Sequence, residues 1–591
     1  MSDLPVLRRT RGNRRRTASQ LVDDTVAESL TYHEHVSLSH AVDEYRAGHA
    51  TRRGFIASSF ALGVSATSLS TLLAACGSPS NEKGATGGGS QKLAVGVNAD
   101  MDTVDPQAFK TIPAYFTMAN VYDQLIDNKR SVVDGNVVAD GAVPAPMIAD
   151  TMEASADRTT FRFALNPKAS FADGTPITAE DVVYTFQRGI EGKQYTATIM
   201  SMLALSSADN IRVVDPHTLE FKLDKPNPMA ERLLSSQVVS ILSKAVGEAN
   251  ATAEDEWASE YWRNNLSANG AYTLKSWNRG EGWELAPNPR YYRAGLPKNG
   301  GVVFRVVADP QERLNLLRTG TLNVAYDIPT KDAVGIRDGD AETARLVSVP
   351  SPWAFALAFT NTVKPLDDKR VRQALSYAVP YDDIIANVMH RLARLSKGPV
   401  PPGMSTHDPS IWGYQTDLAK AKQLLEAAGH GDGFSSTIEV LIGRPEDEQA
   451  ATLIQANFRE IGVNVDVAKL SEAQYQDHRV KGTAPMQIVE WFSWVNDPFY
   501  HLFFNYLSTN AGTNSARYAN KRVDKLITDG LYEIDEAKRA SMSAEAQKLI
   551  IDDAPWAFLF VRDFYAAVSA NFRDFPIWPD LNPRFYWSSL A

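Results

Sequence analysis

Residues 446–467 read EDEQAATLIQANFREIGVNVDV, and this segment decides the fold class. Its first part, up to Ile461, predicts a helix, and the following Gly462 is a typical helix end. Residues 463–467 then alternate valine with polar side chains, as in a strand that buries one face. A helix, a glycine and a strand in this order are typical of layered α/β folds.

Elements of both kinds continue through the rest of the chain, with no repeat of fixed period. We expect a strand over residues 92–97, and helices that begin at the capping residues Thr178, Asp367 and Asp417. Thr178 is followed by Asp181, as in a capping box, and then by a face made of Val182, Val183 and Phe186. The helix after Asp417 is expected to end at Gly429.

The first 76 residues have the composition of an export signal. Residues 51–76 read TRRGFIASSFALGVSATSLSTLLAAC, with the twin arginines Arg52 and Arg53, a weakly apolar run and small residues before Cys76. This pattern predicts twin-arginine export, cleavage before Cys76 and lipidation of that cysteine, the only one in the chain. The alternative is a single transmembrane anchor, because residues 55–75 are uncharged and about long enough to span a bilayer.

Two segments flank this signal. Residues 1–50 form a polar N-terminal extension that does not resemble a compact domain, and we expect the true start codon to lie after Met1. Residues 77–91 are rich in glycine and serine and predict a flexible tether between the membrane and the folded body.

The charge balance excludes some function classes. The chain has 591 residues, with 60 Lys and Arg against 70 Asp and Glu. The leader, residues 1–75, holds nine of these basic and seven of these acidic residues, so the remainder has a net charge of −12. An acidic surface argues against nucleic acid as a partner. The length predicts two to four lobes.

Metal and cofactor sites are not expected. With Cys76 acylated, neither a disulfide nor a cysteine metal site can form. The six histidines after the leader show no ligand spacing, and they are His217, His390, His407, His430, His478 and His501. A metal carried by a chelator stays open as a cargo.

Nine motifs together resemble a known family. They are VDP (104–106), PMIAD (146–150), TFRFAL (160–165), FADGTPITAEDV (171–182), NGAY (269–272), NPRYY (288–292), LDDKRVRQAL (366–375), AKAKQLL (419–425) and DAPW (553–556). In combination they resemble the extracellular solute-binding proteins, family 5, which serve peptide- and nickel-type ABC importers. The resemblance covers about residues 92–591. Most of these motifs serve turns and helix starts, so they identify the family without marking its pocket.

The resemblance implies an α/β fold of the periplasmic-binding-protein class II type, with two lobes, a hinge and an extra domain. The implied parts are lobe I (92–128, 270–353 and 566–591), the extra domain (129–269) and lobe II (354–565). A solute is expected to bind between the lobes as the hinge closes.

A tryptophan-rich loop that ends in Asp-Pro lines the cleft in this family. Here it reads WFSWVNDP (491–498), and it supplies the candidate ligand contacts Trp491, Trp494, Asn496 and Asp497. In several peptide binders the fourth residue before this proline is an aspartate that pairs with the ligand's α-ammonium. Trp494 stands there in this chain, and Asp497 either compensates or only shapes the turn.

Three more ligand contacts follow from the resemblance. Arg444, in Gly-Arg-Pro, resembles an arginine that binds the carboxylate of short peptides, and its alternative role is an ion pair at a helix start. Tyr115 and Phe355 either line the cleft or belong to the core. An arginine without the ammonium aspartate predicts an acidic or amphipathic solute, such as a modified peptide, an opine-like conjugate or a sugar derivative.

The resemblance predicts a monomeric receptor of an ABC importer, whose partners are a solute, the permease and the ATPase. It is expected on the outer face of the cell membrane, in the periplasm or on the cell surface, held by its lipid. We do not expect an enzyme, because the chain has neither a Gly-x-Ser-x-Gly nor a His-Glu-x-x-His motif. The alternatives are a sensory binding protein on the same fold and, last, an exported hydrolase.

Overall fold

The computed structural model describes residues 91–133, 135–194, 196–339, 343–510 and 512–591. Residue contacts divide the chain into two units. The described part of the smaller unit is residues 130–133 and 135–138, which are segments of strands β2 (Ile126–Val133) and β3 (Asn136–Pro146). All other described residues belong to the larger unit, and the candidate site lies wholly within it.

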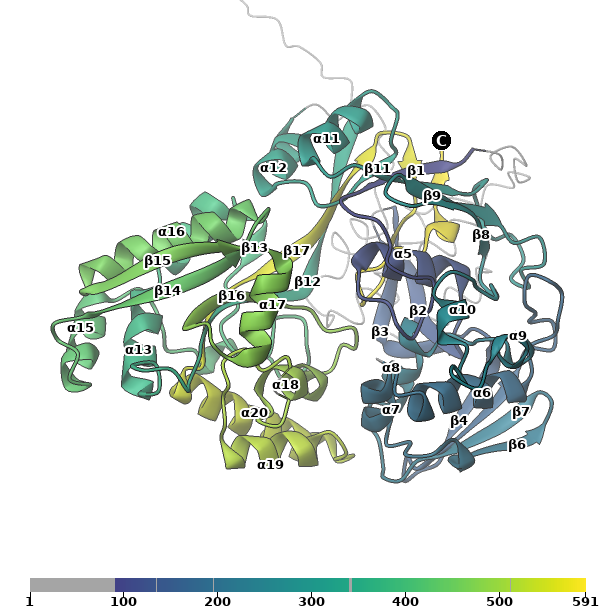
Figure 1. Ribbon diagram of the computed structural model, residues 1–591, viewed down its shortest axis with the longest axis horizontal. Coiled ribbons are helices and arrows are strands. Elements are labelled where there is room, and N and C mark those ends of the chain that lie inside the picture. The colour runs from purple at the N-terminus through teal and green to yellow at the C-terminus, as the bar shows by residue number, and fades with distance from the viewer. Residues whose placement is uncertain (1–90, 134, 195, 340–342, 511) are drawn as a thin grey trace, which may run out of the picture. The chain divides into compact units, whose positions relative to one another are not determined.

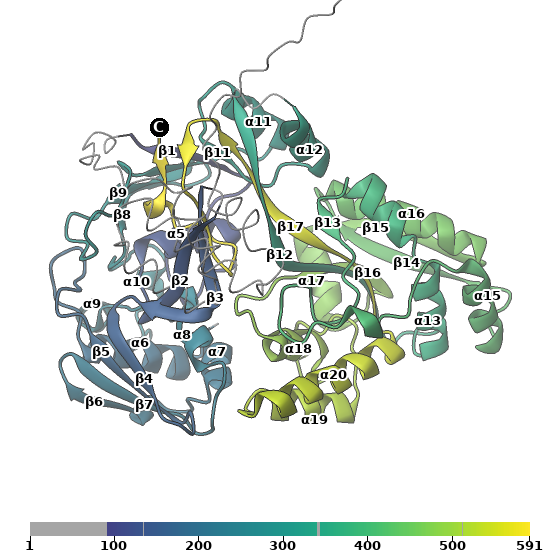
Figure 2. The same ribbon diagram turned by 180° about the vertical axis from the view of Figure 1, so that it is seen from behind.

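A mixed sheet forms the centre of the larger unit (Figure 1). In spatial order its described strands are β15 (Val463–Leu470), β14 (Phe434–Leu441), β16 (Met486–Trp491), β12 (Ala344–Phe359), β17 (Trp556–Ser569), β11 (Val324–Ala325), β1 (Leu93–Val97), β10 (Val302–Val306), β9 (Gly282–Pro287) and β8 (Tyr272–Asn278), with β13 (Ala393–Arg394) paired to β17. The long strands β12 and β17 run antiparallel, side by side in both views (Figure 2). They join strands β14, β15 and β16 on one side to strands β11, β1, β10, β9 and β8 on the other.

Three smaller sheets complete the β structure of the described residues. They are β4 (Ala149–Ala154), β5 (Thr160–Leu165), β7 (Thr218–Lys222) and β6 (Ile211–Asp215), then β19 (Phe575–Ile577) with β3 and β2, and then β18 (Phe572–Arg573) with β20 (Ser589–Leu590).

Helices cover the sheets. They are α5 (Ile112–Val121), α6 (Ala179–Glu191), α7 (Ala197–Leu203), α8 (Ala230–Leu234), α9 (Lys244–Asn250), α10 (Ser259–Trp262), α11 (Pro310–Arg318), α12 (Thr330–Asp338), α13 (Lys369–Ala378), α14 (Tyr381–Asp383), α15 (Leu418–Ala427), α16 (Pro445–Glu460), α17 (Glu472–Lys481), α18 (Pro498–Tyr506), α19 (Lys521–Gly530) and α20 (Glu536–Asp553). Short turns of other helical types are η1 (Ala208–Asn210), η2 (Gln237–Val239), η3 (Ile384–Val388), η4 (Pro409–Ile411) and η5 (Phe585–Trp587). Within the described ranges, none of these helices has the length and apolar character needed to cross a membrane.

The segment that predicted the fold class forms the expected elements. Helix α16 begins at Pro445 and buries Ile454 and Phe458. Gly462 then takes a positive φ of 80°, which favours glycine, and lies directly before β15. Strand β15 pairs in parallel with β14, and β14 pairs in parallel with β16. The α/β prediction is therefore confirmed.

The other predicted elements are also present, with one correction. Strand β1 begins at Leu93, and Thr178 and Asp417 are the N-caps of α6 and α15. The cap of α13 is Asp368 and not Asp367, because its side chain accepts the hydrogen bond from Arg370 N.

A buried ion pair connects the Val-Asp-Pro motif to helix α6. Arg188 donates to both carboxylate oxygens of Asp105, at 3.1 and 2.6 Å, and to the side chain of Gln107 at 2.8 Å. Both charged side chains are almost fully buried. Because a buried charge must be paired, these contacts fix α6 against the loop that follows β1.

We predict that Asp105→Ala lowers the free energy of unfolding by about 3–5 kcal/mol, because it leaves the Arg188 charge buried without its partner. Urea denaturation measures this change. Glu254→Ala, on an exposed loop, is the control, with an expected effect within about 0.5 kcal/mol. Equal stability of the two variants would contradict the role given to the pair.

Candidate functional site

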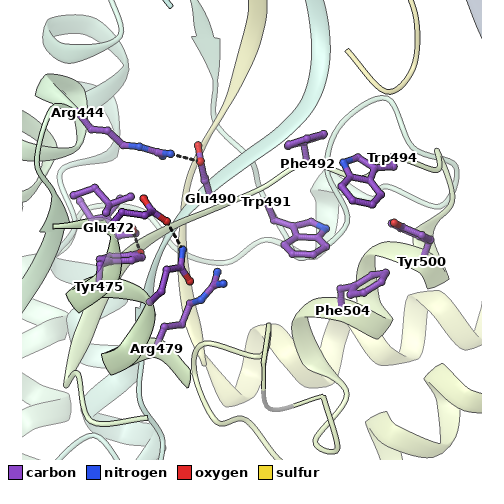
Figure 3. A pocket seen from close by; sticks show the side chains of 13 residues that line it. Arg444, Glu472, Tyr475, Arg479, Glu490, Trp491, Phe492, Trp494, Tyr500 and Phe504 are labelled. Carbon is purple, nitrogen blue, oxygen red and sulfur yellow. Dashed lines mark hydrogen bonds and ion pairs between the residues drawn. The ribbon is translucent and has the colours of Figure 1, made fainter. Parts of the chain in front are cut away.

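A cavity of about 210 Å³ lies beside the loop of residues 491–498 (Figure 3). Strand β16 and helices α17 and α18 supply most of its walls. The lining residues are Leu441, Arg444, Glu472, Tyr475, Gln476, Arg479, Ile488, Glu490, Trp491, Phe492, Trp494, Tyr500 and Phe504. Two of the predicted contacts from the tryptophan loop, and the predicted arginine, thus line one cavity.

One side of this cavity is aromatic. Trp491 is the last residue of β16, and its ring stacks on Phe504 of α18 with centroids 5.1 Å apart. Tyr500 lies one helical turn before Phe504, at 4.9 Å, because residues four apart share a helix face. This wall offers a flat apolar surface to a bound molecule. The buried indole N–H of Trp491 has no hydrogen-bond partner in the described part of the chain.

The other side of the cavity is ionic. Arg444, the N-cap of α16, pairs with Glu490, and the other oxygen of Glu490 accepts a bond from Trp353 Nε1 at 3.1 Å. Burial alone would raise the pKa of Glu490, but the charge of Arg444 and its hydrogen bond hold that pKa below its usual value. Asp447 Oδ2 lies 3.9 Å from Arg444 Nη1, and burial raises the pKa of Asp447 to about 7. Arg444 is therefore already matched by a carboxylate of the protein.

Glu446, two residues after Arg444, has a different partner. Its carboxylate accepts hydrogen bonds from the backbone and the hydroxyl of Thr330, at 2.9 and 2.8 Å. It joins the start of α16 to the start of α12.

Asp497 is fully buried and committed to internal contacts. It caps α18 by accepting from Phe499 N at 2.9 Å. Its oxygens also pair with Arg539 at 2.7 and 2.9 Å and with Arg232 at 2.9 Å. These contacts favour the turn-shaping role, and a direct contact of Asp497 with solute stays a prediction.

Trp494 and Asn496 lie on the loop between β16 and α18. The ring of Trp494 stacks on Tyr115 of α5, with centroids 5.5 Å apart and planes 19° apart. Tyr115 is buried and does not line this cavity. Asn496 and Trp494 both line a smaller hollow next to Arg232, and Asn496 Oδ1 has no partner among the described residues.

Phe355 lies in the core of the sheet. Its ring stacks on Phe560 at 4.7 Å. Its neighbour Trp353 lines a second cavity, of about 40 Å³, and Arg562 stands over the Trp353 ring at 4.0 Å. Phe355 lines neither cavity, so its role as a ligand contact also stays a prediction.

Three further predicted residues, Arg52, Arg53 and Cys76, lie outside the described residues. No cluster of three or more potential metal-binding side chains occurs within the described ranges.

Sequence reasoning missed all of the cavity residues contributed by α17 and α18. Tyr475 and Arg479 are four apart in α17, and Tyr500 and Phe504 are four apart in α18. The spacing shows that each pair shares a face. That these faces meet at one cavity depends on how both helices pack beside β16, which local patterns do not reveal.

The comparisons with known proteins identify the family. The model of the bacterial extracellular solute-binding proteins, family 5, matches residues 143–513. The chain belongs to this family. One relative of the family 5 protein is the probable D,D-dipeptide-binding periplasmic protein DdpA of Escherichia coli, with 27% identity over 84% of this chain and 94% of the relative. The glutathione-binding protein GsiB of Pectobacterium atrosepticum is also 27% identical, over 73% of this chain and 83% of its own.

A solved structure shows the fold. The periplasmic binding protein DppA of Helicobacter pylori, in complex with the peptide STSA, matches with a TM-score of 0.74 and 22% identity. The match covers 85% of this chain and 98% of that protein. The predicted class II periplasmic-binding-protein fold is confirmed. The family 5 chain shares that fold with periplasmic binding proteins.

A buried histidine holds the tryptophan loop to α18. His501 Nδ1 lies 3.0 Å from the hydroxyl of Ser493, and both residues are buried. Burial lowers the pKa of His501 to about 3, so the ring is neutral in the folded protein at pH 4–7.

We predict an acid-sensitive contribution from His501. Below about pH 6.5 the unfolded chain takes up a proton at this histidine while the folded chain does not, so stability falls as pH falls towards 3, by up to about 1.4 kcal/mol per pH unit. The free energy of unfolding of the wild type, minus that of His501→Gln, should therefore decrease as the pH falls from about 6.5 towards 3. Above pH 7 this difference should stay constant. A difference that does not change with pH would contradict the prediction.

Proposed function

We propose that this chain is the solute receptor of an ABC importer, and that it captures a small organic solute, peptide-like or related, in the cavity beside residues 491–498. The observation that carries the proposal is a cavity with an aromatic wall on one side and fixed ionic groups on the other. Ligand sites in proteins combine such apolar surface with a few placed polar groups. Membership of a family of solute-binding proteins supports the proposal.

The class of solute is suggested by the relatives and by the site. The relatives are named for D,D-dipeptides and glutathione, and one solved neighbour holds a peptide. The site differs from that of an ordinary peptide binder, because Trp494 stands where an aspartate would pair with the ammonium group. Asp497 is already paired with Arg539 and Arg232.

No uncommitted buried carboxylate lines the cavity within the described ranges. Glu490 is paired with Arg444, and the exposed Glu472 accepts a bond from Gln476 at 2.7 Å. The proposed solute is therefore acidic or amphipathic and lacks a free α-ammonium group. A modified peptide, an opine-like conjugate and a sugar derivative all have this chemistry.

Delivery of the solute completes the proposed role. Hinge closure between lobe I (92–128, 270–353 and 566–591) and lobe II (354–565) would enclose the solute, with 129–269 as the extra domain. A monomer would then present the closed form to the permease and its ATPase. Twin-arginine export and lipidation at Cys76 would hold the protein on the outer face of the membrane.

A thermal-shift screen of the full-length chain tests the proposal. The library holds free and N-blocked dipeptides, opine-like conjugates, oligosaccharides and nickel chelates. A solute at 100 times its dissociation constant should add about 2.7 kcal/mol of stability. No shift with any compound, or conversion of a compound to products, would contradict the proposal. Neighbouring permease genes favour import over the sensory alternative.

We predict that Trp491→Ala weakens binding of any solute found by about 2 kcal/mol, roughly 30-fold, because the aromatic wall loses its central ring. Isothermal titration calorimetry measures the change. Trp277→Ala is the matched control, since Trp277 lies on β8 and does not line the cavity. Equal losses in the two variants would place the solute elsewhere.

A further inference from the structure

Arg479 has a charge that the described part of the protein leaves unmatched. The last turn of α17 holds three basic residues, His478, Arg479 and Lys481. His478 Nδ1 lies 2.8 Å from Glu439, and Lys481 pairs with Asp477 at 2.8 Å. No carboxylate of the described chain pairs with Arg479, which points towards the cavity (Figure 3).

The backbone around Arg479 is firmly held. The hydroxyl of Tyr475, one turn earlier on the same helix face, donates to Ile488 O of β16 at 2.7 Å. Arg517 donates to the carbonyl oxygen of Arg479 at 2.9 Å. Helix α17 is therefore hydrogen-bonded to β16 through Tyr475, and a carbonyl group of its last turn is hydrogen-bonded to Arg517. A binding group on such a support is pre-organised.

The other charged residues of this lining are one arginine and two glutamates. Its other guanidinium, Arg444, is paired with Glu490. Glu472 accepts the bond from Gln476. Arg479 is thus the one basic group of this lining without an ionic partner in the described ranges, and the exposed Glu472 is the one carboxylate without such a partner. Complementarity to an anion is therefore local to Arg479.

Two buried donors of the same lining also lack acceptors among the described residues. They are Arg479 Nε and Trp491 Nε1. A buried donor without an acceptor is costly, and a charge-assisted hydrogen bond is among the strongest that it can form. Both groups donate and neither accepts, so the missing partner is an acceptor such as a carboxylate.

We propose that Arg479 is the anchor for a carboxylate group of the solute, with the rest of the solute against the ring of Trp491. This inference rests on the proposed function and assigns the anion contact to a residue of α17 in place of Arg444. Arg444 then has a structural role, in which it neutralises Glu490 and holds the start of α16 beside β16. A planar guanidinium suits this task because it binds both oxygens of a carboxylate.

Matched probes on the full-length chain test the assignment. One pool contains N-acetylated dipeptides with a free C-terminal carboxylate, and the second contains the same dipeptides as C-terminal amides. We expect the carboxylate pool to bind at least about tenfold more tightly, and Arg479→Gln to abolish this preference. Lys481→Gln removes a positive charge from the exposed side of the same helix and should retain the preference. Arg479→Lys should restore part of it.

Each outcome bears on the inference. Equal binding of the two pools, or a preference that survives in Arg479→Gln, would overturn the anchor and leave the proposed function standing. Loss of the preference in Lys481→Gln as well would also overturn it, because the effect would then be a general one of charge. Absence of binding by both pools would overturn the anchor together with a peptide-like cargo. Melting temperatures of the variants show whether each is folded. If Arg479→Gln is not folded, Arg479→Lys is tested in its place and should show only part of the wild-type preference.

Discussion

The buried carboxylate of Asp497 fixes the loop on which the site is built. It caps α18, pairs twice with Arg539 of α20 and once with Arg232 of α8. A charge in this environment is stable only with all its partners in place, so the three elements and the loop must adopt one arrangement. The ion pair with Arg232 joins residues far apart in the sequence, across what the family resemblance describes as the extra domain and lobe II. The position of Trp494 follows from this arrangement, and Trp491 is held by the pairing of β16 with β12.

Within that frame, some charged groups of the site have ionic partners in the protein, and Arg479 has none among the described residues. Arg444 and Glu490 neutralise one another, and Trp353 adds a hydrogen bond to the same carboxylate. Trp494, at the position where the family resemblance implies an aspartate in several peptide binders, stacks on Tyr115 and makes that end of the site apolar. The aromatic wall and the unmatched Arg479 remain. We propose that such a site favours an anion attached to an apolar body over a zwitterion.

The sequence predicted the fold well, because its signals are local. The alternation after Gly462, the capping box at Thr178 and the Asp417 cap each depend on a few adjacent residues, and all three form as expected. The candidate site was predicted only in part. Trp491, Trp494 and Arg444 do line one cavity, but the ionic partners of Arg444 and Asp497 come from segments distant in sequence. The contribution of α17 was missed for the same reason. Whether a face of this helix lines a cavity depends on how the helix packs on strand β16, and the local sequence does not show that packing.

A crystal structure of the full-length chain with a solute identified by screening would show directly whether the cavity beside residues 491–498 binds that solute. We predict that the solute lies in the cavity beside β16, with its apolar part against Trp491 and an acidic group within hydrogen-bond distance of Arg479. The Arg444–Glu490 pair should remain intact in the complex. A solute bound outside this cavity, or bound to Arg444 after separation from Glu490, would contradict the account.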